Sequence, residues 1–472
     1  MGKRVKIEYK DDWTEISVPD SAMVLQYGTA EFPDIPVHPD PEKAVREALE
    51  NPIEMERIPE LVKRGSKVTI AFDDPIKHPE LSLRVIVPIV IDELCKAGVR
   101  EEDITLLCAI GAHCKLRPNE FRALLGSELY DRFRPFDWKD ERLVSHDCLQ
   151  GNVYLGDTDL GDEVEYNRAV AEADQVIYVG TVYPVPYGGY AGQGAVIGLA
   201  STRALRSLHS YDVFRTSGVL HADYRPEKNI YRKHKLAVHK KIESATGKRI
   251  FYVDALTGPK QEIVKVFAGH VPDLEKVEYS EADKYYVVRV PQVDIVVLGL
   301  HYTLDYDTSD NPGSTCNYVA RTARAWVNKP LLRENGVIIA LGQCRGVFSP
   351  RRPGDLEAFR LYRECFSIKE LYDYFDAFCN NPEYVYKYRY EYAYSPIHSI
   401  FLMANIEPMQ RVASRTIIAG DVSPGVVREM GALPARNFDE AMARAMEIVG
   451  KDPDILVLPR YYRDPKPIFK VI

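Results

Sequence analysis

The sequence predicts an α/β fold with mainly parallel sheets. Short apolar runs of strand length alternate with segments of helical periodicity along most of the chain, which is the pattern of repeated β-α-β units. Polar and glycine-rich segments follow directly after several of the apolar runs, and ligands of parallel sheets bind at that edge. The 472 residues are enough for two or three domains.

The first part of the chain contains three strand candidates, each followed by a loop and a helical segment. KVTIAF, ITLLCAI and an apolar run ending at Gly180 have the length of buried strands. In order, we predict a strand at 67–72, a helix at 83–97, a strand at 104–110, a helix at 118–126, a strand at 175–180 and a helix at 201–208.

A second alternating series begins near Tyr285, after a break at 268–280 that is the best linker candidate. We therefore predict an N-terminal domain over 1–272 and a C-terminal domain over 273–472, with a last βαβ unit that could pack back on the first domain. The predicted elements are strands at 285–290, 294–299, 336–341, 415–420 and 455–459, and helices at 317–334, 354–366, 369–378 and 439–449.

Composition excludes several classes of protein. The net charge of −8 argues against nucleic acid as the main partner. Because no apolar run approaches the roughly 20 residues of a membrane span and the first residues contain no apolar signal region, we predict a cytoplasmic protein. The eight cysteines are scattered without a CxxC pair, which argues against a disulfide framework or a cysteine-based zinc site. Association into a homo-oligomer stays open.

Polar residues follow two of the predicted strands. Asp73, Asp74, Lys77 and His78 come after the first, and His113 follows the second. Carboxylates, a lysine and a histidine at one sheet edge could bind hydroxyls, orient an imidazole or transfer protons. The structural alternative is that Asp73 caps a turn and His113 is an ordinary loop histidine.

A glycine-rich loop, residues 188–198, follows the third strand. Gly189, Gly192, Gln193 and Gly194 lie between this strand and the predicted helix that ends at His209. Glycines let the backbone approach a ligand, and a helix N-terminus presents free N–H groups to an anion. His209 could be a metal ligand or acid–base group, or a charged histidine stabilised by a helix C-terminus.

A further polar cluster lies in the second series. His301 follows the strand at 294–299, and Asn317, Arg321 and Arg324 lie on the next helix. The two arginines are three residues apart and share a face, from which they could hold a substrate carboxylate. A solvated helix face is the structural alternative.

The order of these motifs resembles the nickel-pincer lactate racemase family. A strand ending in Asp-Asp stands where the family has DD-x-T-R-P, and Gly-x-His follows the next strand. A proline-containing glycine loop that leads to a histidine is similar to the family segment E-P-H-x-x-A-G-[YF]-S-G-G-x-K, and the ending DPDILVLP fits as well. The resemblance implies two α/β domains with the active site in the cleft between them. It also implies hydride transfer from C2 of a 2-hydroxy acid to a nickel pincer nucleotide.

Carried over position by position, the resemblance makes His113 the first acid–base histidine, and His209 the nickel ligand if two residues are deleted after the loop. The second acid–base histidine falls on Val185, and the lysine that tethers the cofactor falls on Ala195. Lysine is absent between Lys139 and Lys228, so the resemblance implies a cofactor held without a covalent bond. Tyr183, Tyr187 or His301 could replace the second histidine.

We therefore predict an isomerase, a racemase or epimerase of a 2-hydroxy acid or sugar acid, and assign a role to each site residue. The catalytic residues are His113, Asp73, Lys77 and Tyr183; the cofactor-binding residues are Asp74, Gly189, Gly192, Gln193 and Gly194; the substrate-binding residues are Asn317, Arg321 and His301; the metal ligand is His209. Two alternatives remain: a catalytically altered paralogue that binds a nucleotide or hydroxy acid, and an isomerase with a different metal.

Overall fold

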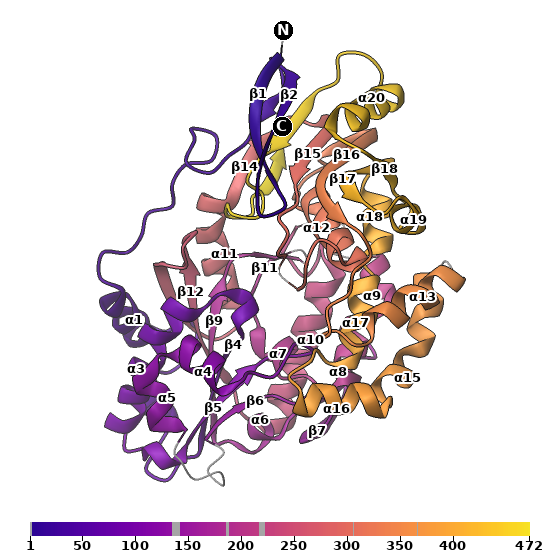
Figure 1. Ribbon diagram of the computed structural model, residues 1–472. Coiled ribbons are helices and arrows are strands. Elements are labelled where there is room, and N and C mark those ends of the chain that lie inside the picture. The colour runs from indigo at the N-terminus through magenta and orange to yellow at the C-terminus, as the bar shows by residue number, and fades with distance from the viewer. Residues whose placement is uncertain (1, 135–141, 186–187, 217–221, 305, 366) are drawn as a thin grey trace.

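The protein is an α/β molecule built on two six-stranded sheets (Figure 1). The computed structural model describes residues 2–134, 142–185, 188–216, 222–304, 306–365 and 367–472. The predicted α/β class with mainly parallel sheets is confirmed. Among the described residues, no helix combines the length and the apolar character needed to cross a membrane.

The first sheet has the strand order β13-β12-β9-β4-β5-β6 and is parallel except for β13. All residues of β4 and β9 are buried, as expected for strands covered on both faces. The chain continues from β4 to β5 on one side and later adds β9 on the other, so the strand order reverses beside β4. Open α/β sheets bind ligands at such a switch point. The strands are β4 (Val68–Asp73), β5 (Ile104–Ala109), β6 (Leu143–Ser145), β9 (Gln175–Val182), β12 (Ile250–Thr257) and β13 (Ile263–Gly269).

Helices and small hairpins surround this sheet. The helices are α1 (Pro41–Glu50), α2 (Ile58–Leu61), α3 (Glu80–Lys96), α4 (Pro118–Leu125), α5 (Ser127–Phe133), α6 (Arg168–Glu172), α7 (Gly194–Gly198), α8 (Thr202–Leu208), α9 (Tyr211–Thr216) and α10 (Ile230–Thr246), with single turns η1 (Pro75–Lys77) and η2 (Glu101–Asp103). The hairpins pair β7 (Asn152–Asp157) with β8 (Glu163–Asn167), and β10 (Pro184–Val185) with β11 (Gly189–Tyr190).

The second sheet has the order β18-β17-β16-β15-β19-β3 and is parallel throughout. Its strands are β3 (Met23–Val24), β15 (Val293–Gly299), β16 (Leu332–Cys344), β17 (Arg415–Val422), β18 (Leu433–Ala435) and β19 (Ile455–Leu458), and β14 (Val287–Val290) pairs separately with β20 (Ile468–Val471). The helices are α11 (Asp273–Tyr286), α12 (Pro312–Arg324), α13 (Asp355–Cys365), α14 (Ile368–Leu371), η3 (Tyr372–Tyr374), α15 (Phe375–Cys379), α16 (Pro382–Tyr390), α17 (Pro396–Met403), α18 (Ile406–Val412), α19 (Pro424–Glu429) and α20 (Phe438–Val449).

The N-terminus belongs to the second sheet rather than the first. The hairpin of β1 (Gly2–Tyr9) and β2 (Asp12–Pro19) packs its apolar side chains against the second sheet, and β3 pairs with β19. Both strands of the last βαβ unit, β17 and β19, also lie in this sheet, although we allowed for packing on the first domain. The division at residues 272 and 273 stays a prediction.

Several predicted elements were wrong in their bounds. The predicted helix at 317–334 ends at Arg324, and β16 already begins at Leu332. Asn328 and Pro330 lie between them, and proline cannot continue a helix because it lacks an N–H donor. The strand predicted at 285–290 begins only at Val287, because α11 continues through Tyr286.

Candidate functional site

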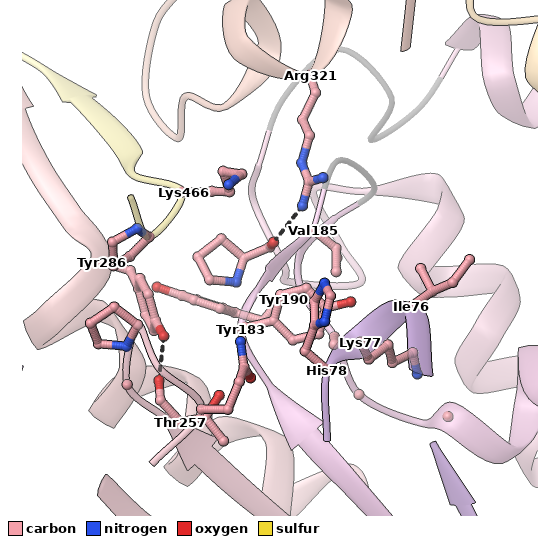
Figure 2. A pocket seen from close by; sticks show the side chains of 18 of the residues that line it. Ile76, Lys77, His78, Tyr183, Val185, Tyr190, Thr257, Tyr286, Arg321 and Lys466 are labelled. Atoms are coloured by element: carbon pink, nitrogen blue, oxygen red, sulfur yellow. Dashed lines mark hydrogen bonds between the residues drawn. The ribbon is translucent and has the colours of Figure 1, made fainter. Parts of the chain in front are cut away.

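A cavity of about 550 Å³ lies at the carboxyl ends of the first sheet's strands, where the switch point predicts a ligand site. Residues from both halves of the chain line it, and Figure 2 shows Arg321 and Lys466 of the second half opposite the 76–78 segment that follows β4. The lining residues with functional groups include His78, His113, Tyr183, His209, Lys235, Arg321 and Lys466.

Asp73 anchors one wall of the cavity. It ends β4, is 1% exposed and accepts hydrogen bonds from the Tyr178 hydroxyl at 2.7 Å and from the Thr181 amide and hydroxyl at 2.9 Å each. The Lys77 ammonium lies 2.6 Å from the same carboxylate. Burial alone would lower the pKa of Lys77, but Asp73 and Asp74 outweigh it and raise that pKa. Asp73 therefore holds Lys77 as a cation at the cavity wall and has little capacity left to act as a base.

Asp74 and His113 form a carboxylate–imidazole pair. Asp74 is 2% exposed, and one of its oxygens lies 2.5 Å from Nδ1 of His113, which lines the cavity. A carboxylate in this position keeps the proton on Nδ1 and leaves Nε2 to exchange a proton with a ligand. Asp74 thus contacts the imidazole of His113. Orienting this imidazole was one expectation from the sequence, and the other, a contact with the cofactor, stays a prediction.

His398 is a histidine that the sequence did not reveal as a site residue. It lies on α17, and its ring centroid is 5.2 Å from that of His113. The Arg352 guanidinium donates to its Nδ1 at 2.7 Å. Burial, together with the neighbouring Arg352, holds the pKa of His398 well below its usual range. Because His398 follows no predicted strand, no local pattern pointed to it.

His209 caps the C-terminus of α8, as predicted. Its ring stacks on Phe401 with centroids 4.9 Å apart and meets the edge of Tyr231. Burial, with a smaller contribution from Lys235, lowers the pKa of His209 to about 3. The charged C-cap that was the structural alternative is therefore wrong, because the ring is neutral at neutral pH. Neutral imidazole is the form that binds metals.

The glycines of the loop are required by packing. A Cβ at Gly192 would lie 1.8 Å from the Tyr279 hydroxyl oxygen, and one at Gly194 would lie 2.3 Å from that of Tyr178. Both glycines line the cavity. Gln193 is buried and donates to Glu275 at 2.8 Å on α11, so its side chain is engaged there. Gly189 belongs to β11, where a Cβ would meet the Ala222 carbonyl oxygen.

The fold brings a lysine to the loop from a distant helix. Lys235 on α10 lines the cavity, and its ammonium nitrogen lies 2.5 Å from the carbonyl oxygen of Gly192. Burial and the neighbouring Arg232 hold the pKa of Lys235 well below its usual range. Ala195, the position of the family's tethering lysine, is buried in α7. The glycine-rich loop thus contains no lysine, but Lys235 reaches the same cavity from α10.

The predicted substrate-binding residues divide between the cavity and its surroundings. Arg321 lines the cavity and donates to the Pro184 carbonyl oxygen at 3.2 Å (Figure 2). Asn317, one turn earlier on α12, is buried and lies outside the lining. His301 stacks on Tyr462 at 4.6 Å, so it supports a lining residue from behind.

Of the three groups considered as replacements for the second histidine, Tyr183 lines the cavity directly, beside Val185 (Figure 2). His301 is not among the described lining residues but stacks on the lining residue Tyr462. Tyr187 lies outside the described residues.

Residues 9–219 match the family of the lactate racemase N-terminal domain. This part of the chain is therefore similar to the lactate racemase N-terminal domain. The predicted resemblance to lactate racemases is thus confirmed, and parts of two curated lactate racemases also match the chain. The chain is 24% identical over 313 residues to a lactate racemase of Thermoanaerobacterium thermosaccharolyticum. This match covers 64% of this chain and 66% of that protein. It is 23% identical over 247 residues to a lactate racemase of Lactiplantibacillus plantarum, which covers 50% and 52%. The matches thus span just under two thirds and about half of these relatives.

Solved structures confirm the fold over nearly the whole chain. The lactate racemase apoprotein from Thermoanaerobacterium thermosaccharolyticum superposes with a TM-score of 0.68 at 20% identity, covering 98% of this chain and 99% of that one. A structural-genomics crystal structure from Thermotoga maritima has a TM-score of 0.56 at 14% identity, covering 92% and 98%.

Proposed function

We propose that the protein is a racemase or epimerase that acts on C2 of a 2-hydroxy acid or sugar acid. The observation that carries the proposal is the Asp74–His113 pair at a cavity that also contains cationic side chains, in a chain that is similar to the lactate racemase N-terminal domain over residues 9–219. Racemisation of a hydroxy acid needs a group that binds the carboxylate and a group that moves the hydroxyl proton.

Cations on two walls of the cavity suit a carboxylate substrate. Lys77 is held charged by Asp73, and Arg321 and Lys466 lie across the cavity (Figure 2). Hydrogen bonds between ions and a carboxylate are about twice as strong as neutral ones. Tyr183 and Tyr286 add hydroxyl groups to the lining, which favours a polyhydroxylated acid over lactate.

His113 is the proton-transfer group in this proposal. Asp74 fixes its tautomer, and Nε2 takes the hydroxyl proton of the substrate as the C–O bond gains double-bond character, then returns it. Val185 lines the cavity at the position of the family's second histidine and cannot transfer a proton. Lys235 is the candidate for that task, because it lines the cavity and because burial and the neighbouring Arg232 hold its pKa well below its usual range, so that it releases its proton more readily than an ordinary lysine.

The cavity suits a nickel pincer nucleotide held without a covalent bond through the loop. His209 offers a neutral imidazole to a metal, and the backbone at Gly192 and Gly194 faces the space where the nucleotide would lie. Ala195 provides no amine for a tether. When bound, this group supplies the acceptor for the hydride from C2. The protein's own residues bind the carboxylate, move the proton and, with the walls of the cavity, limit access of water.

The competing proposal is a paralogue that binds a nucleotide or hydroxy acid without turnover, which Ala195 and Val185 favour. Native mass spectrometry with metal analysis separates the two. The protein is purified from a host that makes the pincer nucleotide, together with His209→Ala and, as a control, His38→Gln, a histidine outside the cavity lining. We expect nickel and a nucleotide mass that dissociates on denaturation, both lost in His209→Ala and kept in His38→Gln. A nucleotide without metal in the wild type supports the binding protein. A metal other than nickel that depends on His209 supports the different isomerase.

A further inference from the structure

Two histidines and a glutamate form a compact cluster outside the cavity. His239 and Glu243 lie one turn apart on α10, and His270 follows β13. One ligand atom from each side chain lies within 4.8 Å of the others. None of the three lines the cavity that contains His209, so this His239–Glu243–His270 cluster is separate from the proposed active site.

We propose that this cluster is a divalent metal site that prefers Zn²⁺. Two imidazole nitrogens and one carboxylate oxygen form a donor set that zinc uses widely. Bonds of about 2.0–2.1 Å in tetrahedral geometry place donor atoms about 3.3 Å apart. The Nε2 atom of His239 is 3.7 Å from the Glu243 carboxylate, and Nε2 of His270 is 2.9 Å from it. These two distances lie on either side of the required value, and all three donor atoms lie within 4.8 Å of one another, so an adjustment of the side chains would close the site.

An unexplained buried nitrogen supports the proposal independently. His239 is 1% exposed, and its Nε2 has no hydrogen-bond partner within the described part of the chain. A buried polar atom without a partner costs roughly 1–3 kcal/mol, so each such atom requires an explanation. An ion pair between Glu243 and His270 provides a partner for each of those two side chains, but it provides none for the Nε2 atom of His239. A metal bound at the cluster accounts for all three.

The Glu243 carboxylate also has a supporting hydrogen bond from the backbone. The Ile250 amide donates to the same carboxylate at 2.8 Å, and supporting hydrogen bonds of this kind orient metal ligands.

A metal here would tie two elements of the first sheet's layer together. It would join α10 to the loop after β13, and α10 presents Lys235 to the cavity one turn before His239. Three protein ligands leave a fourth position for water. Because its ligands come from α10 and from the loop after β13, a bound ion would fix the position of α10.

Zinc binding to the metal-free protein tests the proposal. The full chain is produced without the pincer nucleotide, stripped with a chelator, and titrated with Zn²⁺ against a chromophoric competitor. His239→Ala and Glu243→Gln are compared with His234→Gln, which removes a histidine on the same helix that pairs with Asp162 instead. Far-UV circular dichroism of the stripped proteins confirms that each variant folds, and Glu243→Gln preserves the side-chain volume.

We expect one tight Zn²⁺ per chain in the wild type, in His234→Gln and in His209→Ala. Affinity should fall more than about 100-fold in His239→Ala, beyond the 10–100-fold that loss of a supporting hydrogen bond causes, and clearly in Glu243→Gln. Zn²⁺ should raise the melting temperature of the wild type and leave that of His239→Ala unchanged. Only millimolar binding in the wild type, equal binding in all variants, or loss of the site in His209→Ala would overturn the proposal.

Discussion

Replacing Asp74 by Asn tests the proposed role of the Asp74–His113 pair most sharply. The substitution preserves the size of a side chain that is 2% exposed and removes only its charge and acceptor pattern. The contact it breaks, 2.5 Å between the carboxylate and Nδ1 of His113, is a hydrogen bond to a charged group, which contributes about 1.5–3 kcal/mol. That loss alone corresponds to roughly a 10–150-fold lower kcat. Loss of the correct tautomer extends the expected effect toward the 10²–10⁴-fold range of general acid–base catalysis.

The assay is the initial rate of interconversion of the enantiomers, followed by chiral chromatography on the cofactor-loaded protein. Asp162→Asn provides a matched control, because Asp162 is also 2% exposed and pairs with His234, 2.8 Å away and outside the cavity. We expect kcat to fall at least about 10-fold in Asp74→Asn with little change in KM, and to stay near the wild-type value in Asp162→Asn. An equal loss in both variants, or a loss confined to KM, would refute a positioning role for Asp74.

Three further predictions concern the cavity and its loop. Arg321→Met should raise KM for the acid roughly 10–150-fold, because a hydrogen bond from a charged group to the substrate is lost, and it should affect kcat less. Steady-state kinetics measure both constants. A larger effect on kcat than on KM would contradict carboxylate binding by Arg321. Gly192→Ala places a Cβ 1.8 Å from the Tyr279 hydroxyl oxygen, so it should lower the stability measured by thermal unfolding by about 1–3 kcal/mol or more. Gly425→Ala is the control and should leave the stability unchanged, because a Cβ there has no atom within 4 Å. Because the pKa of Lys235 is depressed on folding, the unfolded chain binds the extra proton below about pH 10.4. Wild-type stability should therefore rise with pH relative to Lys235→Met in urea titrations between pH 7 and 9.5, and parallel curves would show that the lysine is charged.

The sequence analysis placed the ligand-binding edge of the first sheet well, because the central strands are short and mostly apolar and because polar residues follow them closely. Asp73, Asp74 and His113 were found in this way, and the structure places all three at strand ends. The different contacts of Asp73 and Asp74 were not predictable, because they depend on side chains that the fold brings to each carboxylate from elsewhere in the chain. Asp73 meets Thr181 and Lys77, whereas Asp74 meets His113.

Two of the cavity's neighbours that the sequence did not point to come from helices far along the chain, whereas Lys466 lies between β19 and β20. Lys235 and His398 reach the site from α10 and α17, and helical periodicity identifies a buried face without saying what that face contacts. The two-residue strand β3 is too short to give a periodic signal, and only its pairing with β19 reveals it. From the sequence, we interpreted the glycines as leaving room for a ligand. The side chains that pack beside Gly192 and Gly194 are tyrosines of other elements, which the local sequence does not show.

The most direct test of the central claim is to incubate the cofactor-loaded protein separately with each enantiomer of a panel of 2-hydroxy acids and sugar acids. We expect at least one acid to reach the same final ratio of stereoisomers from either enantiomer. We expect His113→Gln to abolish this convergence and His38→Gln to retain it. Tight binding of an acid to the loaded wild type with no change in configuration from either side would contradict the racemase and support a binding protein.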